Sequence, residues 1–434
     1  MENSKVTLFW FRRDLRIEDN TAFFNALNSK NNVLPLFIFD TEIIDELEKD
    51  DSRITFIYSL LNGINESLKK FDSSLLIKRG NPIEIFAKLI KQYDVKSIYT
   101  NRDYEPYAKI RDEKIEELLE SNHIEFKTFK DHVIFETDEI VKQDTTAYKV
   151  YTPYSKKWLS TLKDSQLREC ESENLLDKLI KQNFTFPSLS EIGFTESTIK
   201  VVPFDTTNSL IENYNATRNF PAINKTSKLS PHLRFGAISI RKCVKNALKA
   251  EDPTFVKELI WREFFIQILW HFPKSAQFNF KPKYNTIKWR NNESEFEAWC
   301  NGKTGYPIVD AGMNELNETG YMHNRVRMIT ASFLCKHLLI DWKWGEAYFA
   351  KKLLDFDLAQ NVGNWQWSSG TGCDSAPYFR IFNPTEQVKK FDKDLKYIKK
   401  WVPDFQELTY PMPIVEHKFA RARCLETYKS GLNG

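Results

Sequence analysis

Residues 355–384 read DFDLAQNVGNWQWSSGTGCDSAPYFRIFNP, and they hold the most informative pattern in the chain. Two carboxylates, an Asn and two Trp stand in a short segment interrupted by glycines, a mixture that an ordinary core helix does not need. Trp365 and Trp367 are two residues apart, which is about 200° around a helix and places them on opposite sides. We therefore expect one ring to face the interior and the other to line a cavity.

In the first 130 residues, short apolar and β-branched runs alternate with segments of helical period. The expected strands are Val6–Phe11, Val33–Phe39, Leu75–Arg79, Ser97–Thr100 and Glu125–Phe129. The expected helices between them include Arg53–Phe71, Pro82–Tyr93 and Pro106–Ser121. This alternation predicts an α/β domain with a parallel, five-stranded, Rossmann-like sheet that helices cover on both faces. A ligand of such a sheet lies beyond the carboxyl ends of the strands.

The rest of the chain divides into a connector and a helical part. Residues 131–203 are polar and lack a clear period, so they are expected to form an interdomain connector with local helices such as Val150–Leu162. From about residue 204 strand signals disappear. The predicted domains are therefore 1–130 (α/β), 131–203 (connector) and 204–434 (all-α), without internal repeats.

Composition narrows the class of protein. The 434 residues contain no apolar run near the roughly 20 residues of a membrane span, and the amino terminus lacks a signal-peptide core. We expect a soluble, cytoplasmic monomer. Six Cys and seven His show no metal-ligand spacing, so reduced thiols and no metal are expected.

Charge and aromatic residues are distributed unevenly. Residues 1–200 carry 29 Lys+Arg against 35 Asp+Glu, whereas residues 201–434 carry 33 against 24. Nine of the eleven Trp lie at or beyond residue 261. A basic surface interleaved with aromatic rings suits a polyanion with unpaired bases. Solvated charges and large rings in a helical core remain the alternative.

Several segments together resemble the photolyase/cryptochrome family, most closely its class I cyclobutane pyrimidine dimer photolyases. They are 6–20, 226–236, 258–264, 302–339, 355–384 and 410–423. The resemblance covers nearly the whole chain and is weakest at residues 131–200. It implies light-driven repair of ultraviolet-damaged DNA that contains pyrimidine dimers, with FAD as cofactor and its reduced form active.

The resemblance also assigns a cofactor site. Its residues are Tyr214, Thr226, Ser227, Lys228, Leu229, Ser230, Arg327, Asp355, Asp357 and Asn361. Hydroxyls, a Lys and a helix start at Ser230 are compatible with an anion site, although Ser230-Pro231 alone could be merely a helix cap; the resemblance places the FAD pyrophosphate there. Arg327 is the expected partner of Asp355. Asn361 stands against the redox nitrogen of the flavin, where plant-type cryptochromes carry Asp.

Three tryptophans match the electron-transfer triad of the family, namely Trp365, Trp342 and Trp289. Their wide sequence gaps mean that three separate elements must converge. Three unrelated core residues are the alternative.

A second set of residues matches the lesion site. Glu258 and Trp261 are i, i+3 and share one helix face; Asn324 and Met328 are i, i+4 and share another. With Trp367 they suit a flipped-out pyrimidine pair, and Glu258 is expected to hydrogen-bond a thymine carbonyl. Enzymes that repair 6-4 photoproducts carry a His pair on the corresponding helix. This chain has Asn324 and Met328 there and no His at either position, which argues against 6-4 repair.

Three further sequence features do not by themselves distinguish between possible functions. Gly302-Lys-Thr-Gly305 lacks the earlier Gly of a nucleotide-binding loop and is expected to be a turn before a helix near Pro307. At 104–108, Tyr107 and Ala108 replace the polar pair of folate-binding relatives, so the identity of a second antenna chromophore stays open. Four basic residues are either DNA phosphate contacts or solvated charges: Arg290, Arg325, Lys389 and Lys390.

Two other functions compete with repair. A cryptochrome blue-light photoreceptor would keep FAD and the triad but lack productive lesion binding, and Asn361 and the complete lesion set disfavour it. A non-photochemical flavoprotein is weakened by the lack of a substrate acid/base pair.

Overall fold

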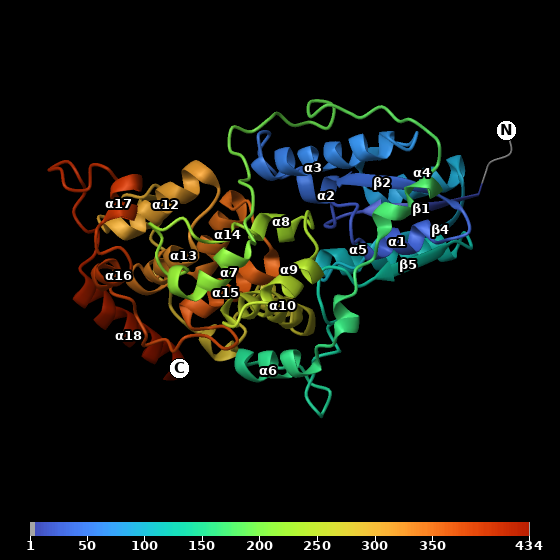
Figure 1. Ribbon diagram of the computed structural model, residues 1–434. Coiled ribbons are helices and arrows are strands. Elements are labelled where there is room, and N and C mark those ends of the chain that lie inside the picture. Colours follow the sequence, from blue (N-terminus) through green and yellow to red (C-terminus); the bar gives the residue numbers. More distant parts are fainter. Residues whose placement is uncertain (1–4, 434) are drawn as a thin grey trace. The chain divides into compact units, whose positions relative to one another are not determined.

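The computed structural model describes residues 5–433, and the chain forms two compact units (Figure 1). Unit 1 consists of Met1–Glu139, Thr161–Phe204 and Lys228–Lys249. Unit 2 consists of Ile140–Ser160, Asp205–Ser227 and Ala250–Gly434. The chain thus crosses between the units several times.

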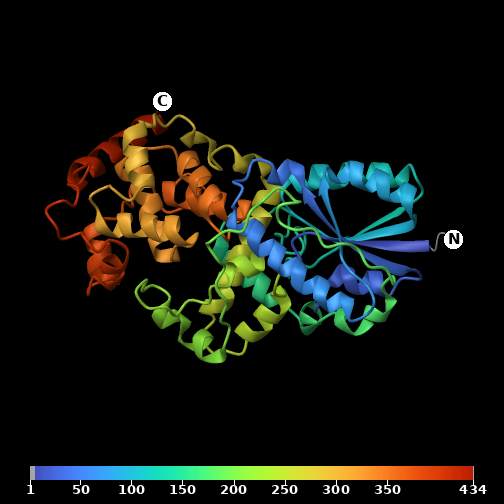
Figure 2. The same cartoon turned by 90° about the horizontal axis from the view of Figure 1, so that it is seen from above.

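Unit 1 is built on a five-stranded parallel sheet, and every predicted strand is present. The strands are β1 (Lys5–Phe11), β2 (Asn32–Asp40), β3 (Leu76–Gly80), β4 (Asp94–Asn101) and β5 (Glu125–Phe129). Their order is β3-β2-β1-β4-β5, with all neighbours parallel. The strands lie side by side in a twisted fan (Figure 2). The Rossmann-like prediction is confirmed.

Alternate side chains of β1 belong to two separate hydrophobic cores. Val6, Leu8 and Trp10 pack with residues of α4 and α5, whereas Phe9 and Phe11 pack with residues of α1 and α3. This is the period of two expected of a strand buried on both faces. The α-helices of unit 1 are α1 (Thr21–Leu27), α2 (Thr41–Ile44), α3 (Ser52–Lys69), α4 (Pro82–Gln92), α5 (Pro106–Glu120), α8 (Ser230–Arg234) and α9 (Ile240–Ala247).

Unit 2 is helical, as the sequence predicted; among residues 205–433 no strand occurs. Its α-helices are α6 (Tyr151–Thr161, the last residue in unit 1), α7 (Asn208–Thr217), α10 (Thr254–His271), α11 (Glu293–Cys300), α12 (Pro307–Thr319), α13 (Asn324–Ser332), α14 (Trp342–Lys352), α15 (Leu358–Ser369), α16 (Pro384–Phe391), α17 (Lys396–Trp401) and α18 (His417–Asn433). A π-helical turn, Phe333–His337, follows α13. Within the described part of the chain, no helix has the length and apolar character to cross a membrane.

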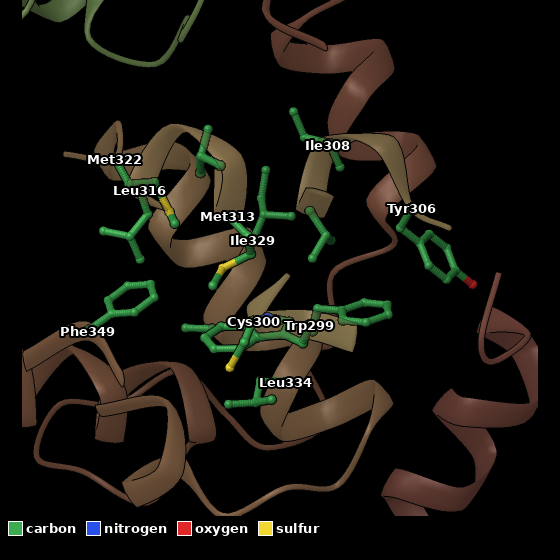
Figure 3. Packing of buried hydrophobic residues seen from close by; sticks show 14 of the residues in the cluster. Trp299, Cys300, Tyr306, Ile308, Met313, Leu316, Met322, Ile329, Leu334 and Phe349 are labelled. Atoms are coloured by element: carbon green, nitrogen blue, oxygen red, sulfur yellow. The ribbon is translucent and has the colours of Figure 1, made fainter. Parts of the chain in front are cut away.

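The main core of unit 2 surrounds Trp299, which is fully buried. Side chains of α11, α12 and α13 point toward one another there, among them Met313 and Ile329 (Figure 3). Trp342 and Trp365 belong to the same cluster. The core therefore holds α14 and α15, which carry candidate site residues.

The Gly302–Gly305 segment is a turn before α12, as predicted. Both glycines have positive φ, 61° and 75°. A Cβ on Gly305 would lie 2.4 Å from the backbone of Met412, so this close approach requires glycine. Thr304 donates from its backbone N and its Oγ1 to Asp310 Oδ1 (2.8 and 2.6 Å), which fixes the start of the helix.

Candidate functional site

Helix α15 presents Asn361 and Trp365 one turn apart on the side packed against α14. Asn361 Nδ2 donates to Glu346 Oε1 at 2.8 Å and to the Glu346 carbonyl at 3.1 Å. These two bonds use both amide hydrogens, so the carbonyl oxygen Oδ1 is the group left to meet a ligand. Glu346, which the sequence did not single out, thus sets the orientation of Asn361.

Arg327 and Asp355 form the expected ion pair, and it is bidentate. The guanidinium donates from its two terminal nitrogens to the two carboxylate oxygens at 3.1 and 2.9 Å, and its Nε donates to the Met322 carbonyl at 2.7 Å. Burial alone would lower the pKa of Arg327, but the Asp355 carboxylate raises it. Asp355 is therefore fixed in place.

Asp357, 6% exposed, lies at the N-cap position of α15.

The loop at 226–230 has the backbone of an anion site in its second half. Lys228 has a positive φ of 53°, and Leu229 follows with φ −75° and ψ −24°. When a residue with left-handed backbone conformation is followed by one with right-handed conformation, their successive N–H groups point toward one place. This is the geometry of an anion-binding nest. Helix α8 begins at Ser230, as predicted.

The first half of this loop, which belongs to unit 2, makes contacts of its own. Thr226 Oγ1 lies 3.4 Å from Tyr321 Oη, and the Ser227 carbonyl accepts from Asp205 N at 2.8 Å. Tyr214 packs edge-on against Phe255, with ring centroids 5.0 Å apart. Burial, with a contribution from Glu258, raises the pKa of Tyr214.

The three tryptophans expected to form a chain come from α15, α14 and the loop before α11, and they meet in one cluster. Trp365 and Trp342 are 2% and 1% exposed. Trp289, which is partly exposed, packs against the same cluster. The Trp365 ring occupies the space beside Gly345, where a Cβ would lie 2.1 Å from it. Trp342 Nε1 donates to Asn279 Oδ1 at 2.8 Å. The first two rings are thus rigidly held in the core.

Helix α10 carries Glu258 and Trp261 on one face, and each has a partner that the sequence did not reveal. Glu258 accepts a short hydrogen bond from Arg218 Nη1. Trp261 stacks on Tyr151, with ring centroids 3.7 Å apart and planes within 6°. A carboxylate and an aromatic face therefore stand together, both partly exposed.

Comparison with known proteins identifies the family of this chain. Residues 7–173 match the family model described as DNA photolyase, and residues 255–409 match the FAD binding domain of DNA photolyase. The chain is 35% identical to a deoxyribodipyrimidine photo-lyase from Synechococcus, over 97% of this chain and 96% of that one. It is 34% identical to the Escherichia coli protein of the same name, over 98% and 99%. The chain belongs to the photolyase/cryptochrome family.

Solved structures of the family have the same fold. A class III photolyase from Agrobacterium tumefaciens superposes with a TM-score of 0.89 at 31% identity, covering 100% of this chain and 99% of that one. An archaeal photolyase from Sulfolobus tokodaii, described with two FAD molecules, gives 0.82 at 34% identity (98% and 100%). A Synechocystis cryptochrome gives 0.84 at 26% identity (98% and 100%).

The remaining family positions lie on α13 and at the end of α15. Asn324 is exposed and Met328 partly exposed, one turn apart. Trp367 is partly exposed, whereas Trp365 is buried, so the two rings of the opening segment do point to different surroundings as expected. Among the described residues, no hydrogen bond or ring contact joins Trp367 to Trp261 or to α13.

The short segment after α7 links the two helices of the lesion set. Arg218 binds Glu258 of α10, and Asn219 Oδ1 accepts from Arg325 Nη2 of α13 at 2.7 Å. Neither Arg218 nor Asn219 was predicted as a site residue, and no local sequence pattern marks them. Two of the four basic residues considered as DNA phosphate contacts are engaged within the chain: Arg290 binds Glu295 (2.7 Å), and Lys389 binds Glu386 (2.7 Å).

The carboxyl that orients Asn361 gives a pH-dependent prediction. Burial raises the pKa of Glu346. A carboxyl with a higher pKa in the folded than in the unfolded state contributes less stability as pH rises through the folded-state pKa. Glu346→Gln removes this titration. Its free energy of unfolding relative to wild type, measured by urea denaturation, should therefore increase as the pH rises from below the ordinary pKa of a glutamate carboxyl through the higher folded-state pKa of Glu346. Glu318→Gln, at an exposed position, is the control; a pH-independent difference for Glu346→Gln would refute the assignment.

Proposed function

We propose that this protein is a light-dependent DNA repair enzyme, a deoxyribodipyrimidine photo-lyase that splits cyclobutane pyrimidine dimers. The observation that carries the proposal is the face of α10, where the Glu258–Arg218 pair adjoins the stacked Trp261 ring. Full-length relatives at 34–35% identity bear this enzyme name. The cryptochrome alternative is favoured by none of the described contacts.

The chain's own residues fit FAD. The nest at Lys228–Leu229 suits a phosphate, since its N–H groups converge without needing a side chain. Asn361 Oδ1, with its amide nitrogen held by Glu346, suits a ring N–H donor. Asp355 is fixed by Arg327 as an acceptor for hydroxyls or ring N–H groups. When bound and reduced, FAD supplies the light-excited electron that opens the cyclobutane ring.

The lesion site has to accept bases taken out of the duplex. Extruding a damaged pair costs a few kcal/mol, and stacking on an aromatic ring can return about 1–3 kcal/mol per base. Trp261 and Trp367 are the rings proposed for this task. Asn324 and Met328 are proposed as the polar and apolar contacts of α13.

Glu258 and Arg218 are proposed to hydrogen-bond different groups of a thymine. A carbonyl needs a donor, which the guanidinium of Arg218 supplies, whereas an ionised Glu258 accepts from the ring N–H. The hydrogen bond between the two holds the donor in place. In this proposal Arg218 takes the carbonyl bond that was expected of Glu258, and its positive charge stands where negative charge develops on the dimer.

Trp365, Trp342 and Trp289 are proposed to carry electrons inward when the bound FAD is oxidised. Their common cluster and the partial exposure of Trp289 support a path from the core to the surface.

Residues 1–130 are proposed as an antenna domain, 131–203 as the connector, and 204–434 as the FAD- and DNA-binding domain. The antenna region holds one feature that disfavours folate: Tyr107 Oη donates to Asp40 Oδ2 at 2.7 Å in place of the expected polar pair. The second chromophore is not assigned further. A monomer in the cytoplasm is also proposed.

Illumination of reduced, FAD-loaded protein with an oligonucleotide that contains one cyclobutane dimer tests the function. Chromatography should show repaired product in the light and none in the dark. An oligonucleotide with a 6-4 photoproduct should remain unchanged. A protein that binds and reduces FAD yet forms no product would overturn the proposal in favour of a photoreceptor.

Glu258→Ala should reduce repair more than binding. It removes the acceptor for the base N–H and the group that holds Arg218, which corresponds to about 1.5–3 kcal/mol for a charge-assisted hydrogen bond, or roughly tenfold or more in repair yield. Affinity for dimer-containing DNA should fall by less, since the stacking rings remain. Glu212→Ala, at an exposed position of α7, should behave as wild type. Equal losses of affinity and yield would make Glu258 a binding contact alone.

A further inference from the structure

We propose that Tyr151 is a positioning residue that fixes the ring plane of Trp261 and thereby sets the selectivity for dimer-containing DNA. The inference deepens the proposed function and rests on it for the identity of the ligand. Tyr151 is the first residue of α6, within the segment that the sequence assigned to a connector. Residues 140–160 belong to unit 2, which also contains the residues of the proposed lesion site.

The stacking contact covers one face of the indole. At 3.7 Å and 6°, the Tyr151 and Trp261 rings are nearly parallel and in contact over their faces. Phe264 approaches Trp261 edge-on at 80°, and Phe265 is tilted by 30° at 5.4 Å. Tyr151 itself is 8% exposed, whereas Trp261 stays partly open. A base can therefore stack only on indole surface that Tyr151 leaves uncovered.

Two polar contacts fix Tyr151 in turn. Its Oη donates to the Lys257 carbonyl at 2.7 Å. In an α-helix this carbonyl also accepts from the amide of Trp261, four residues on, so the phenol is tied to the same helical turn that carries the indole. Its backbone N donates to Asp374 Oδ2 at 2.9 Å.

Asp374 connects Tyr151 to the second aromatic residue of the proposed site. It lies in the segment directly after α15, the helix that carries Trp367, and has a positive φ of 44°. Tyr151 thus bridges the turn that carries Trp261 and the segment that follows Trp367. A single residue therefore joins α10 to the loop that follows α15.

Such support affects binding through pre-organisation. An indole that is free to change rotamer has to be immobilised when a base stacks on it, whereas a held indole has already lost that freedom. Undamaged duplex DNA, which keeps its bases in the stack, does not use this ring. Loss of Tyr151 should therefore weaken binding of damaged DNA selectively.

The test uses Tyr151→Leu, which keeps apolar bulk but removes the planar ring, and Tyr151→Phe, which keeps the ring but removes the hydroxyl. Tyr148→Ala is the matched control, because Tyr148 contacts Tyr154 (6.3 Å) rather than Trp261. The FAD-loaded proteins are compared for Kd toward dimer-containing and undamaged duplexes of one sequence. Because one immobilised side chain is worth about 0.5–1.5 kcal/mol, Tyr151→Leu should raise Kd for the dimer duplex roughly two- to tenfold.

The remaining outcomes separate positioning from stability. Affinity for undamaged DNA, the thermal midpoint of unfolding and the repair rate at saturating DNA should change little in Tyr151→Leu, and Tyr151→Phe should keep most of the selectivity. Equal weakening for both duplexes, or equal loss in the Phe variant, would overturn the proposal.

A readout without DNA distinguishes this proposal from the proposed function. The near-ultraviolet circular dichroism of the stacked pair should be lost in Tyr151→Leu and in Trp261→Phe alike, and the double variant should lose nothing more. If wild type fails to distinguish the two duplexes, the proposed function is what fails. If the dichroism of the two variants is additive, Tyr151 does not hold Trp261.

Discussion

Replacing Trp365 with Phe is expected to slow the light-driven reduction of oxidised, bound FAD by at least an order of magnitude. The residue is 2% exposed and lies on α15 one turn after Asn361, so it is the innermost member of the proposed chain. Phe is much harder to oxidise than Trp, and a barrier higher by only about 1.4 kcal/mol already slows a step tenfold. Absorbance of the bound flavin during illumination with an external reductant measures the rate.

The same variant should repair dimers normally once its FAD is reduced chemically, because repair itself does not use the tryptophans. Trp299→Phe is the matched control: Trp299 is equally buried, 6.1 Å from Trp365 and in the same core, but outside the proposed chain. Similar slowing in both variants would show that loosened packing is responsible. Loss of chemically primed repair in Trp365→Phe would assign the residue another task.

The strands and helices of unit 1 could be predicted from the sequence because their signals are local. On β1, Val6, Leu8 and Trp10 alternate with Phe9 and Phe11, and every one of these residues is apolar. Such a run indicates a strand buried on both faces, and the helices between strands complete the parallel sheet. The parallel direction of the strands follows from those rules, whereas their order, β3-β2-β1-β4-β5, was not predicted.

The assignment of residues 140–160 to unit 2 was not predicted. Val150–Leu162 was expected as a helix, and α6 is there, but its role depends on what it packs against. One available signal was its spacing: Tyr151, Tyr154, Ser155 and Trp158 recur at intervals of three and four and are all buried. That stripe indicates a helix docked on a core rather than a free connector.

The partners within the candidate site were mostly beyond sequence reasoning. Asp355 and Arg327 were paired through the resemblance, whereas the pairs Arg218–Glu258, Glu346–Asn361 and Tyr151–Trp261 were not foreseen. Each joins residues on different elements, and their contacts exist only after the helices have docked. A single sequence carries no signal for such pairs, since a polar residue at a helix surface has many equivalent neighbours.

Asp355→Ala is expected to be the most destabilising of the substitutions considered. It would leave the Arg327 guanidinium, 24% exposed, without the carboxylate that it binds through two nitrogens. Removing one partner of a buried ion pair typically costs about 3–5 kcal/mol, because the remaining charge is left uncompensated. Urea denaturation followed by helical circular dichroism should show this loss even in flavin-free protein.

An exposed ion pair of the same unit provides the control. Asp394 and Lys396 are 58% and 74% exposed and 3.9 Å apart, so Asp394→Ala should cost at most about 1 kcal/mol. Asp355→Asn keeps the shape and one acceptor and should fall between the two. Since Asp355 is also proposed to contact FAD, flavin content should decrease in the order wild type, Asn, Ala. An Asp355→Ala protein as stable as Asp394→Ala would mean that solvent compensates Arg327, and the rigid carboxylate assumed for cofactor binding would then be absent.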